Sequence, residues 1–397
     1  MRIADRIRRL GTETAFAVGA EASAFAAEGN RVYPFHLGDL NIPTPATVVE
    51  GATRAIADGM TGYCPNAGIP QLREAIAADV SASRGVSYTM ENVVVQPGGK
   101  PTIGKFLATL MNAGDEVLYP NPGYPIYESQ IEYLGGVAVP YGYTEAENNF
   151  DLDFDSLERG LTERTRLLVL NDLQNPSGAE LSAEGRSRLA GIVREHDLYV
   201  LSDEAYFDIR YAGESTSIVS EPGMAERCVI LYTFSKRFAM TGWRLGASIG
   251  PKEIVDVIAK LNVNDESCSN HFVQYGALAG LEGDQTEVRG IVETLRARRD
   301  AAREGLDAID GVRCFSPDAT FYLYPNVTEV MRRKDTGDYE AFRRAALHAT
   351  GVSFTTRLHF GSALPGEREQ YVRFAFSGID VAEIEESLAA FKEWCEA

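Results

Sequence analysis

Short apolar runs alternate with amphipathic segments from about residue 50 to residue 285. Several of these runs are apolar at consecutive positions, which is typical of parallel strands that helices cover on both faces. Between them, residues 69–82 and 182–196 have apolar side chains three and four positions apart, which predicts amphipathic helices. The predicted strands are residues 92–96, 116–120, 137–142, 166–172, 198–207, 228–234 and 245–250. The alternation predicts an α/β fold with a mainly parallel, seven-stranded sheet wrapped by helices.

The pattern changes at about residue 286, where a long charged helix begins and is followed by short strands and further helices. This change predicts a smaller α+β domain. Residues 36–45 are rich in turn-forming residues and cannot make a core alone, so the N-terminal segment is expected to pack with the smaller domain or to reach a partner subunit. The predicted division is residues 46–285 for the large domain, and residues 1–45 plus 286–397 for the small domain and N-terminal segment.

Charge and cysteine content narrow the possible functions. The chain has 38 Lys and Arg against 57 Asp and Glu, and its net charge of −19 disfavours nucleic acid and anionic membranes as partners. Its five cysteines are widely spaced without a CxxC pair, which indicates neither disulfides nor a zinc site and favours a cytoplasmic location. The histidines show no metal-ligand spacing, although His271 is a candidate for lining a substrate pocket. Neither a signal peptide nor a membrane span is predicted.

One glycine-rich turn is a candidate phosphate site. Residues 93–110 have the pattern strand, glycine turn and helix. The backbone N–H groups of Gly98, Gly99 and Lys100 would then lie at a helix N-terminus, where phosphates bind. An ordinary strand-to-helix turn is the alternative, because the spacing matches neither a dinucleotide fingerprint nor a P-loop.

Three more strand ends are followed by polar side chains that suit one cofactor. Asn175 follows one strand, in the region where open α/β sheets bind ligands. Asp203 directly follows another apolar run, where a buried carboxylate needs a partner. Lys236 follows a third, with Arg244 eight positions on. Each could be a turn, a cap or an ion pair, but together they offer an amine for an aldehyde and a carboxylate for a pyridinium. With a phosphate site, these are the requirements of pyridoxal 5′-phosphate.

From about residue 30 to its end, the chain resembles the class I/II pyridoxal-phosphate aminotransferases of the aspartate aminotransferase superfamily, of fold type I. The stretch SKRFAMTGWRLG resembles that family's lysine motif. The resemblance implies that Lys236 binds the cofactor covalently and later moves the proton at the substrate α-carbon. It also implies that Arg244, Ser235 and Thr233 hold the phosphate together with the N–H groups of the glycine turn.

Further motifs resemble the segments that hold the cofactor ring in this family. SDEAY matches the segment whose aspartate pairs with the pyridine nitrogen, so Asp203 is the implied partner of the ring. Tyr206, and Asn175 in NPSG, are implied to donate hydrogen bonds to the phenolic oxygen. Tyr124, in YPNPGYPIY, matches the position of an aromatic ring that stacks on the pyridine.

Three motifs concern the partner subunit and the substrate. Tyr63, in GYCPNAGIPQLREAI, matches a tyrosine that reaches the phosphate of the neighbouring subunit, which implies a homodimer with shared active sites. YVRFAFS resembles the strand whose arginine binds the substrate α-carboxylate, here Arg373. Gly38, in HLGDLN, lies where the family's N-terminal segment closes over the substrate.

One departure from the family pattern concerns the substrate. The stretch LNVNDESCSNHF falls where dicarboxylate-specific members carry an arginine that the neighbouring subunit provides. This chain has Asp265 and Glu266 there instead. If either faces the site, it favours a substrate with a cationic side chain over aspartate or glutamate. The alternative is that both belong to a solvated acidic surface.

The predicted function is an aminotransferase of amino acid metabolism or biosynthesis, which moves an amino group from an L-amino acid to a 2-oxo acid in a ping-pong cycle. Pyridoxal-phosphate lyases, cyclases and oxidases share the same cofactor residues and are the alternative. A ligand-sensing domain of a transcription regulator would need an appended DNA-binding domain. A Rossmann dehydrogenase would need a glycine fingerprint at the first strand. The sequence does not choose the amino donor or the acceptor.

Overall fold

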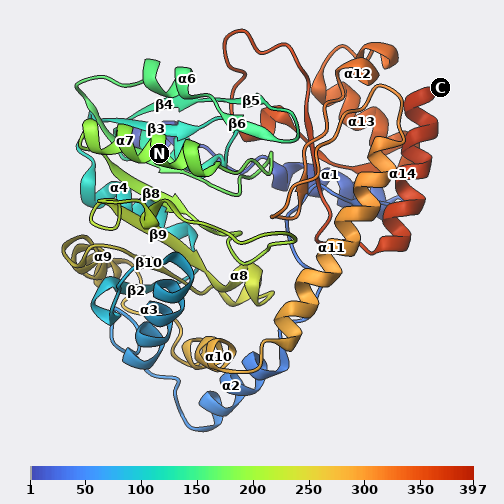
Figure 1. Ribbon diagram of the computed structural model, residues 1–397. Helices are drawn as coiled ribbons and strands as arrows, with labels where there is room; N and C mark the ends of the chain where they lie inside the picture. The colour runs from blue at the N-terminus through green and yellow to red at the C-terminus, as the bar shows by residue number, and fades with distance from the viewer. Residues whose placement is uncertain (1) are drawn as a thin grey trace.

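A seven-stranded sheet lies at the centre of the computed structural model, which describes residues 2–397 (Figure 1). Its strands are β2 (Val93–Gln96), β3 (Glu116–Pro120), β4 (Val137–Tyr141), β7 (Thr165–Leu170), β8 (Tyr199–Asp203), β9 (Cys228–Thr233) and β10 (Gly246–Ile249). Their order is β2-β10-β9-β8-β7-β3-β4. β10 is antiparallel to both of its neighbours, and the other pairs are parallel. The predicted α/β fold with a mainly parallel sheet is confirmed.

Helices cover both faces of this sheet because its strands are apolar on both sides. In β2, for example, Val94 belongs to one apolar core, and Val93 and Val95 belong to the other. One face is covered by α4 (Lys100–Leu110), α5 (Ile126–Tyr133) and α9 (Lys252–Asp265). The opposite face is covered by α3 (Pro70–Arg84), α7 (Ala183–Glu195) and α10 (His271–Glu282).

The C-terminal part has its own core and a small sheet. α11 (Thr286–Asp307) runs from beside α10 to this part, where it packs against α14 (Val381–Glu396) (Figure 1). The small sheet has the order β11 (Tyr322–Leu323), β14 (Val372–Ala375) and β13 (Thr355–Thr356). Besides two short strands that are described below, the other elements of residues 2–397 are α1 (Ala15–Ala27), α2 (Ala46–Ala57), α6 (Phe154–Arg159), α8 (Phe234–Arg237), α12 (Thr328–Lys334), α13 (Tyr339–Thr350), five short 3-10 helices and the hairpin of β5 (Tyr143–Glu145) and β6 (Phe150–Leu152).

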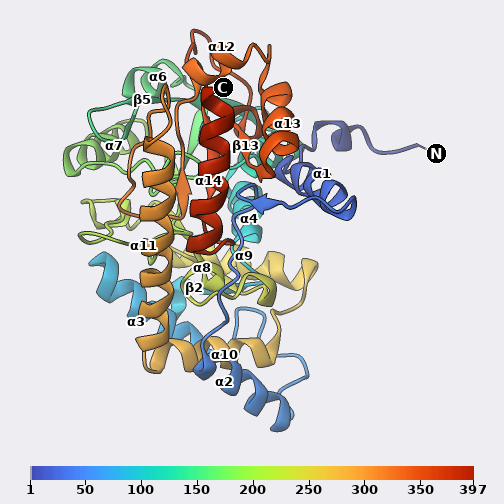
Figure 2. The ribbon, with the colours of Figure 1, turned by 90° about the vertical axis from the view of Figure 1, so that its right-hand side faces the viewer.

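The N-terminal segment packs with this C-terminal part. β1 (Tyr33–Pro34) pairs in parallel with β12 (Val352–Ser353), and Phe35 lies in the same apolar core as Phe374. Figure 2 shows α1 beside α13 on one side of the molecule. The division of the chain at residues 46 and 286 stays a prediction, and these contacts agree with it.

The carboxyl edge of the large sheet brings several strand ends together. β2 and β9 run in the same direction on either side of β10, and Gly246 is paired with both Gln96 and Thr233. β10 therefore begins at the edge where its neighbours end. β3, β7 and β8 end at this edge too, because they run parallel to β9. Side chains just beyond these strand ends can therefore meet.

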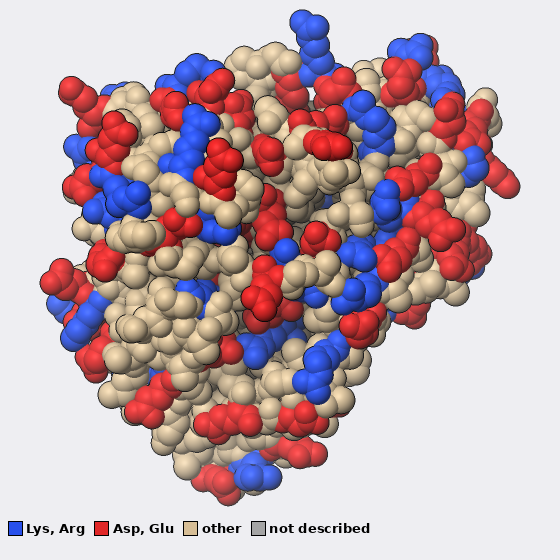
Figure 3. Space-filling model, viewed as in Figure 1, with Lys and Arg blue, Asp and Glu red and all other residues tan. Residues whose placement is uncertain are grey.

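The surface is mixed in charge. Figure 3 shows acidic and basic side chains interspersed over one face of the molecule. Within residues 2–397, none of the helices has the length and apolar character needed to cross a membrane, and all five cysteines are free thiols. The same residues contain no cluster of metal-binding side chains. The cytoplasmic location stays a prediction.

A buried ion pair holds the end of β8 in place. Nε of Arg84, on α3, lies 2.9 Å from Oε2 of Glu204, and the two side chains are only 1% and 4% exposed. Glu204 also accepts hydrogen bonds from Ser202 and Ser217. Glu204 directly follows Asp203, so this pair fixes the backbone at the carboxyl edge of the sheet.

Replacing Arg84 by methionine should lower the free energy of unfolding by about 3–5 kcal/mol, because Glu204 would stay buried without its cation. Urea denaturation at a fixed protein concentration measures this change. Arg332→Met is the matched control, since it breaks an exposed pair on α12 and should leave the free energy of unfolding almost unchanged. Equal losses in the two variants would contradict a stabilising role for the buried pair.

Candidate active site

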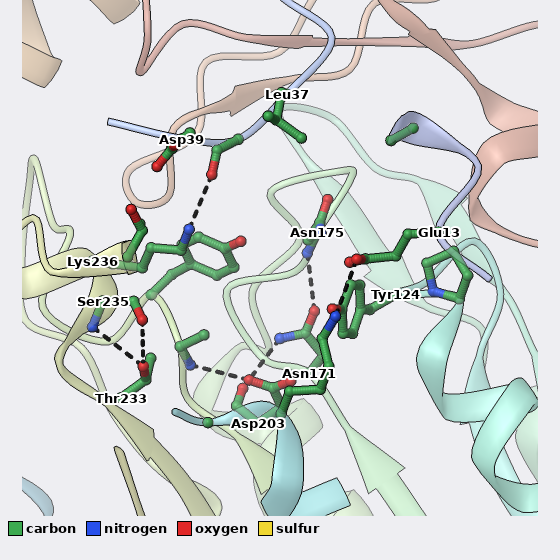
Figure 4. A pocket seen from close by; sticks show the side chains of 18 of the residues that line it. Glu13, Leu37, Asp39, Tyr124, Asn171, Asn175, Asp203, Thr233, Ser235 and Lys236 are labelled. Atoms are coloured by element: carbon green, nitrogen blue, oxygen red, sulfur yellow. Dashed lines mark hydrogen bonds and ion pairs between the residues drawn. The ribbon is translucent and has the colours of Figure 1, made fainter. Parts of the chain in front are cut away.

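A cavity of about 680 Å³ lies at the carboxyl edge of the sheet (Figure 4). Its lining includes residues that follow five strands: Gly99 and Lys100 after β2, Tyr124 after β3, Asn171 and Asn175 after β7, Asp203 and Tyr206 at the end of β8, and Thr233, Ser235 and Lys236 at the end of β9. Gly38, Arg244 and Arg373 line it as well. The structure thus brings most of the predicted site residues into one cavity.

Lys236 lies on α8, the short helical turn that follows β9. Thr233 caps this turn, since its Oγ1 accepts a hydrogen bond of 3.2 Å from the backbone N–H of Ser235. Nζ of Lys236 donates to the carbonyl oxygen of Gly38 at 3.0 Å. Burial lowers the pKa of Lys236 to about 8, and the positive charge of Arg373 also lowers it. Such an amine is neutral more often near pH 7, which makes it a better nucleophile than a solvated lysine.

Asp203 is a buried carboxylate with two hydrogen-bond donors and no ion-pair partner among residues 2–397. Its Oδ2 accepts a hydrogen bond of 2.6 Å from the hydroxyl of Tyr127, and its Oδ1 accepts one of 3.1 Å from the backbone N–H of Ala205. Burial raises the pKa of Asp203 to about 6, against the opposing effect of the Tyr127 hydrogen bond. A cation placed beside this carboxylate would remove most of the cost of burying its charge.

Arg373, on β14, presents a buried guanidinium to the cavity. It donates to Oδ1 of Asn175 at 2.9 Å and to the carbonyl oxygen of His36 at 2.8 Å. Its Nε is buried and has no hydrogen-bond partner in the described chain. The hydroxyls of Tyr206 and Tyr322 lie 2.7 Å apart close by, and the guanidinium stacks over the Tyr322 ring. A fork of donors with spare capacity suits a carboxylate.

The first turn of α4 and Arg244 form a cradle for an anion. Gly98 has a φ of +100°, and a side chain there would collide with the Arg244 guanidinium. A side chain at Gly99 would collide with Leu231. Arg244 donates to the carbonyl oxygen of Thr241 at 2.7 Å, which leaves its other N–H groups for a ligand. Open backbone N–H groups at the start of an eleven-residue helix, with an arginine beside them, suit a phosphate.

The residues present fit pyridoxal phosphate. The cavity offers an anion cradle at α4, an amine at Lys236 and a buried carboxylate at Asp203 that lacks a cation. These complement a phosphate, an aldehyde and a protonated pyridine ring, respectively. The donors that Arg373 leaves free lie beside them, where a second anionic group can bind.

Four of the predicted residues do not line the cavity of their own chain. Gly98 is not among the lining residues, and its backbone N–H donates to the carbonyl oxygen of Gln96 at 2.8 Å, so this N–H is not open to a phosphate as the sequence predicted. Tyr63 is 88% exposed. The carboxylates of Asp265 and Glu266 lie 3.8 and 2.5 Å from Nζ of the buried Lys105. Contact of Tyr63 with a neighbouring subunit stays a prediction. Within this chain both acids pair with Lys105. Selection of the substrate by Asp265 or Glu266 also stays a prediction.

Several residues that line the cavity were not predicted from the sequence. They include Glu13, Phe16, Asp39, Tyr127, Asn171, Tyr322 and His359. Tyr127 could have been found, because it follows Tyr124 by three positions in a motif that was already singled out. Glu13 and Tyr322 come from distant segments and had no local signal. His271 does not line the cavity of its own chain, whereas His359 does, and contact of His271 with a substrate in a neighbouring cavity stays a prediction.

The chain is similar to known proteins over nearly all of its length. The family model described as aminotransferase class I and II matches residues 32–391. An aspartate aminotransferase of Musicola paradisiaca is 33% identical over 378 residues, which cover 95% of this chain and 92% of that protein. An aspartate/prephenate aminotransferase of Thermus thermophilus is 31% identical, over 93% of this chain and 97% of that protein. The structure of an aspartate aminotransferase from Thermus thermophilus with maleate has a TM-score of 0.90 at 31% identity, and covers 99% of this chain and 100% of that one.

The raised pKa of Asp203 predicts a pH-dependent stability of the protein freed of any cofactor. The neutral Asp203 carboxyl stabilises the folded protein below the ordinary pKa of an aspartate. This stabilisation is lost as the pH rises through about 6. The free energy of unfolding of Asp203→Asn, relative to that of the wild type, should therefore rise by about 1–3 kcal/mol as the pH is raised from about 5 to about 8. Thermal denaturation at both pH values measures the difference. Asp151→Asn, at an exposed position, is the control, and a pH-independent difference for Asp203→Asn would contradict the prediction.

Proposed function

The chain belongs to the aminotransferase class I and II family, and from this membership we propose how its own residues carry out the reaction. The enzyme is a transaminase, which moves an amino group from an amino acid to a 2-oxo acid. The proposal rests on one observation: Lys236, Asp203 and Arg373 face the same cavity at the carboxyl edge of the sheet. The comparisons do not favour the lyase, cyclase or oxidase alternative, because the relatives described above are named aminotransferases.

The proposed cofactor is pyridoxal phosphate, which this family uses. When bound, it supplies an aldehyde that captures amino groups and a ring that takes up the electron pair left at the substrate α-carbon. The N–H groups of Gly99 and Lys100, the guanidinium of Arg244 and the hydroxyls of Ser235 and Thr233 would hold its phosphate. This assignment is supported by the cradle at the start of α4, where side chains on the two preceding glycines would not fit.

The ring would lie between Asp203 and the tyrosines of the cavity. The carboxylate of Asp203 would hold the proton on the ring nitrogen, because that cation is the partner that the buried carboxylate lacks. Tyr206 and the amide Nδ2 of Asn175 would donate hydrogen bonds to the phenolic oxygen. Oδ1 of Asn175 already accepts from Arg373, which leaves Nδ2 free for this role. Tyr124 would contact the face of the ring.

Lys236 and Arg373 would act on the substrate. The fork of Arg373 would bind the α-carboxylate and so orient the Cα–H bond toward Nζ of Lys236. Nζ would accept the α proton and later return it, and the lowered pKa of Lys236 suits an amine that must do both near neutral pH. The hydrogen bond from Nζ to Gly38 brings the N-terminal segment over this position, where it would exclude water.

The proposed partner is a second copy of this chain, as in the shared-site homodimers that the family resemblance implies. The exposed apolar side chains of the described chain include Val49 and Ile56 on α2, Tyr63, and Val257 and Val263 on α9. Contact between two copies would remove this apolar surface from water. In such a dimer the Tyr63 hydroxyl would reach the phosphate of the neighbouring cavity.

Half-reactions followed by visible absorbance test the proposed function. An amino acid added to the purified holoenzyme should convert the absorbance of lysine-bound pyridoxal phosphate, and a 2-oxo acid should restore it. Ammonia release or oxygen uptake in place of this reversible change would contradict the transaminase assignment and favour the lyase, cyclase or oxidase alternative.

Lys236→Ala should abolish the visible band of the lysine-bound cofactor and lower the transamination rate by at least about 10³-fold, because both the covalent anchor and the proton carrier are lost. Spectra and half-reaction rates measure both effects. Lys252→Ala removes an exposed lysine and should change neither. Retention of the band and of turnover by Lys236→Ala would show that another group is the anchor.

Tyr63→Phe should weaken the affinity for pyridoxal phosphate by about tenfold or more, because a hydrogen bond to the charged phosphate is lost. Equilibrium dialysis gives the affinity, and sedimentation should give the mass of a dimer for both proteins. Tyr199→Phe, at an exposed tyrosine of β8, serves as the matched control. A monomeric wild type, or equal affinities, would contradict the role given to Tyr63.

A further inference from the structure

The N-terminal segment places a carboxylate, that of Glu13, on the wall of the cavity. The segment is anchored on both sides of this residue. The backbone N–H of Gly11 donates to Oγ of Ser129, on α5, at 3.0 Å. Beyond Glu13, helix α1 is tied to α13 by the pair of Glu21 and Arg343, 2.5 Å apart. Glu13 therefore sits where the segment passes from the large sheet's helices to the C-terminal part.

Glu13 lies opposite Lys100 in the cavity. Its Oε2 is 3.1 Å from Nζ of Lys100, and Figure 4 shows its carboxylate near the ring of Tyr124. Glu13 is the less exposed partner, at 18% against 46% for Lys100. The positive charge of Lys100 is therefore balanced by a carboxylate that the fold holds in place.

The charged lining side chains that are not used by the cofactor or the substrate α-carboxylate include more acids than cations. The cations of the described lining are Lys100, Lys236, Arg244 and Arg373, and the acids are Glu13, Asp39 and Asp203. The proposed function uses Lys236, Arg244, Arg373 and Asp203. One cation, Lys100, then remains with two acids, Glu13 and Asp39. The charged side chains of the lining that the proposed function leaves unused therefore sum to a net negative charge.

We propose that Glu13 determines substrate specificity: its carboxylate neutralises Lys100, rejects acidic side chains and favours amino acids whose side chain ends in a cation. The inference rests on the proposed function of the same cavity. An acidic side chain would have to compete with Glu13 for Lys100, which places like charges together. A cationic side chain can pair with Glu13 instead. Lys100 is half exposed, so its ammonium can turn into water.

The apolar lining fits the stem of such a substrate. Phe16, on α1, and Leu37 line the same cavity as Glu13. The methylene groups of a long cationic side chain can pack on apolar side chains while its charged end stays polar and hydrated. Glu13, Phe16 and Leu37 all belong to the N-terminal 45 residues, so one segment would recognise both the stem and the charge.

Glu13→Gln tests the inference with the holoenzyme, because it keeps the size of the side chain and removes its charge. The second-order rate constants of the half-reaction are measured with ornithine, glutamate and alanine. The ornithine-to-glutamate ratio should fall by about tenfold in this variant. Lys100→Gln should move the ratio in the opposite direction, which a general disturbance of the site would not do.

Asp5→Asn is the control, since it makes the same change of charge on an exposed part of the same segment and should leave the ratio within twofold of the wild type. An unchanged ratio in Glu13→Gln overturns the role of Glu13. Alanine separates this result from failure of the proposed function: reversible conversion by alanine shows that transamination is intact, whereas ammonia release or oxygen uptake by the wild type in place of reversible conversion overturns the proposed function itself.

Discussion

The burial of the Asp203 carboxylate without a cation is the constraint on which the rest of the site depends. Desolvation makes the charged form costly, and the two hydrogen bonds that Asp203 accepts offset only part of that cost. The protein holds the group there with the buried pair of Arg84 and Glu204 directly behind it. Because the fold holds this carboxylate rigidly, a ligand that brings the missing cation gains binding energy by pairing with it. The carboxylate also keeps the cationic group of that ligand protonated.

The sheet and the cofactor residues could be predicted because their signals are local. Each strand of the large sheet is a short apolar run, and the carboxyl ends of parallel strands meet at one edge. Asp203, Lys236 and Asn175 each directly follow such a run, so their convergence follows from the topology. The family resemblance added roles, but the positions are already implied by chain direction.

The substrate end of the cavity could not be predicted, because its residues come from segments far apart in the chain. Glu13 precedes the first long helix, Tyr322 lies on a two-residue strand and His359 on a single 3-10 turn. None of these segments has a periodic pattern. Asp265 shows a different difficulty: its position in the sequence suggested contact with a substrate in a neighbouring subunit, and within its own chain it lies at the end of α9, 3.8 Å from Nζ of Lys105. Which way a helix end turns depends on packing that the sequence does not display.

The reversed direction of β10 has a consequence for how this site can change over evolutionary time. Because β9 ends and β10 begins at the same edge, one short connection contains both Lys236 and Arg244, and both of its ends are fixed by sheet pairing. An insertion or deletion in this connection alters the spacing of the two groups at once, whereas most other cavity residues are untouched. Lys236 and Arg244 therefore form one unit whose length the sheet fixes, whereas the N-terminal segment can change in length without disturbing the sheet.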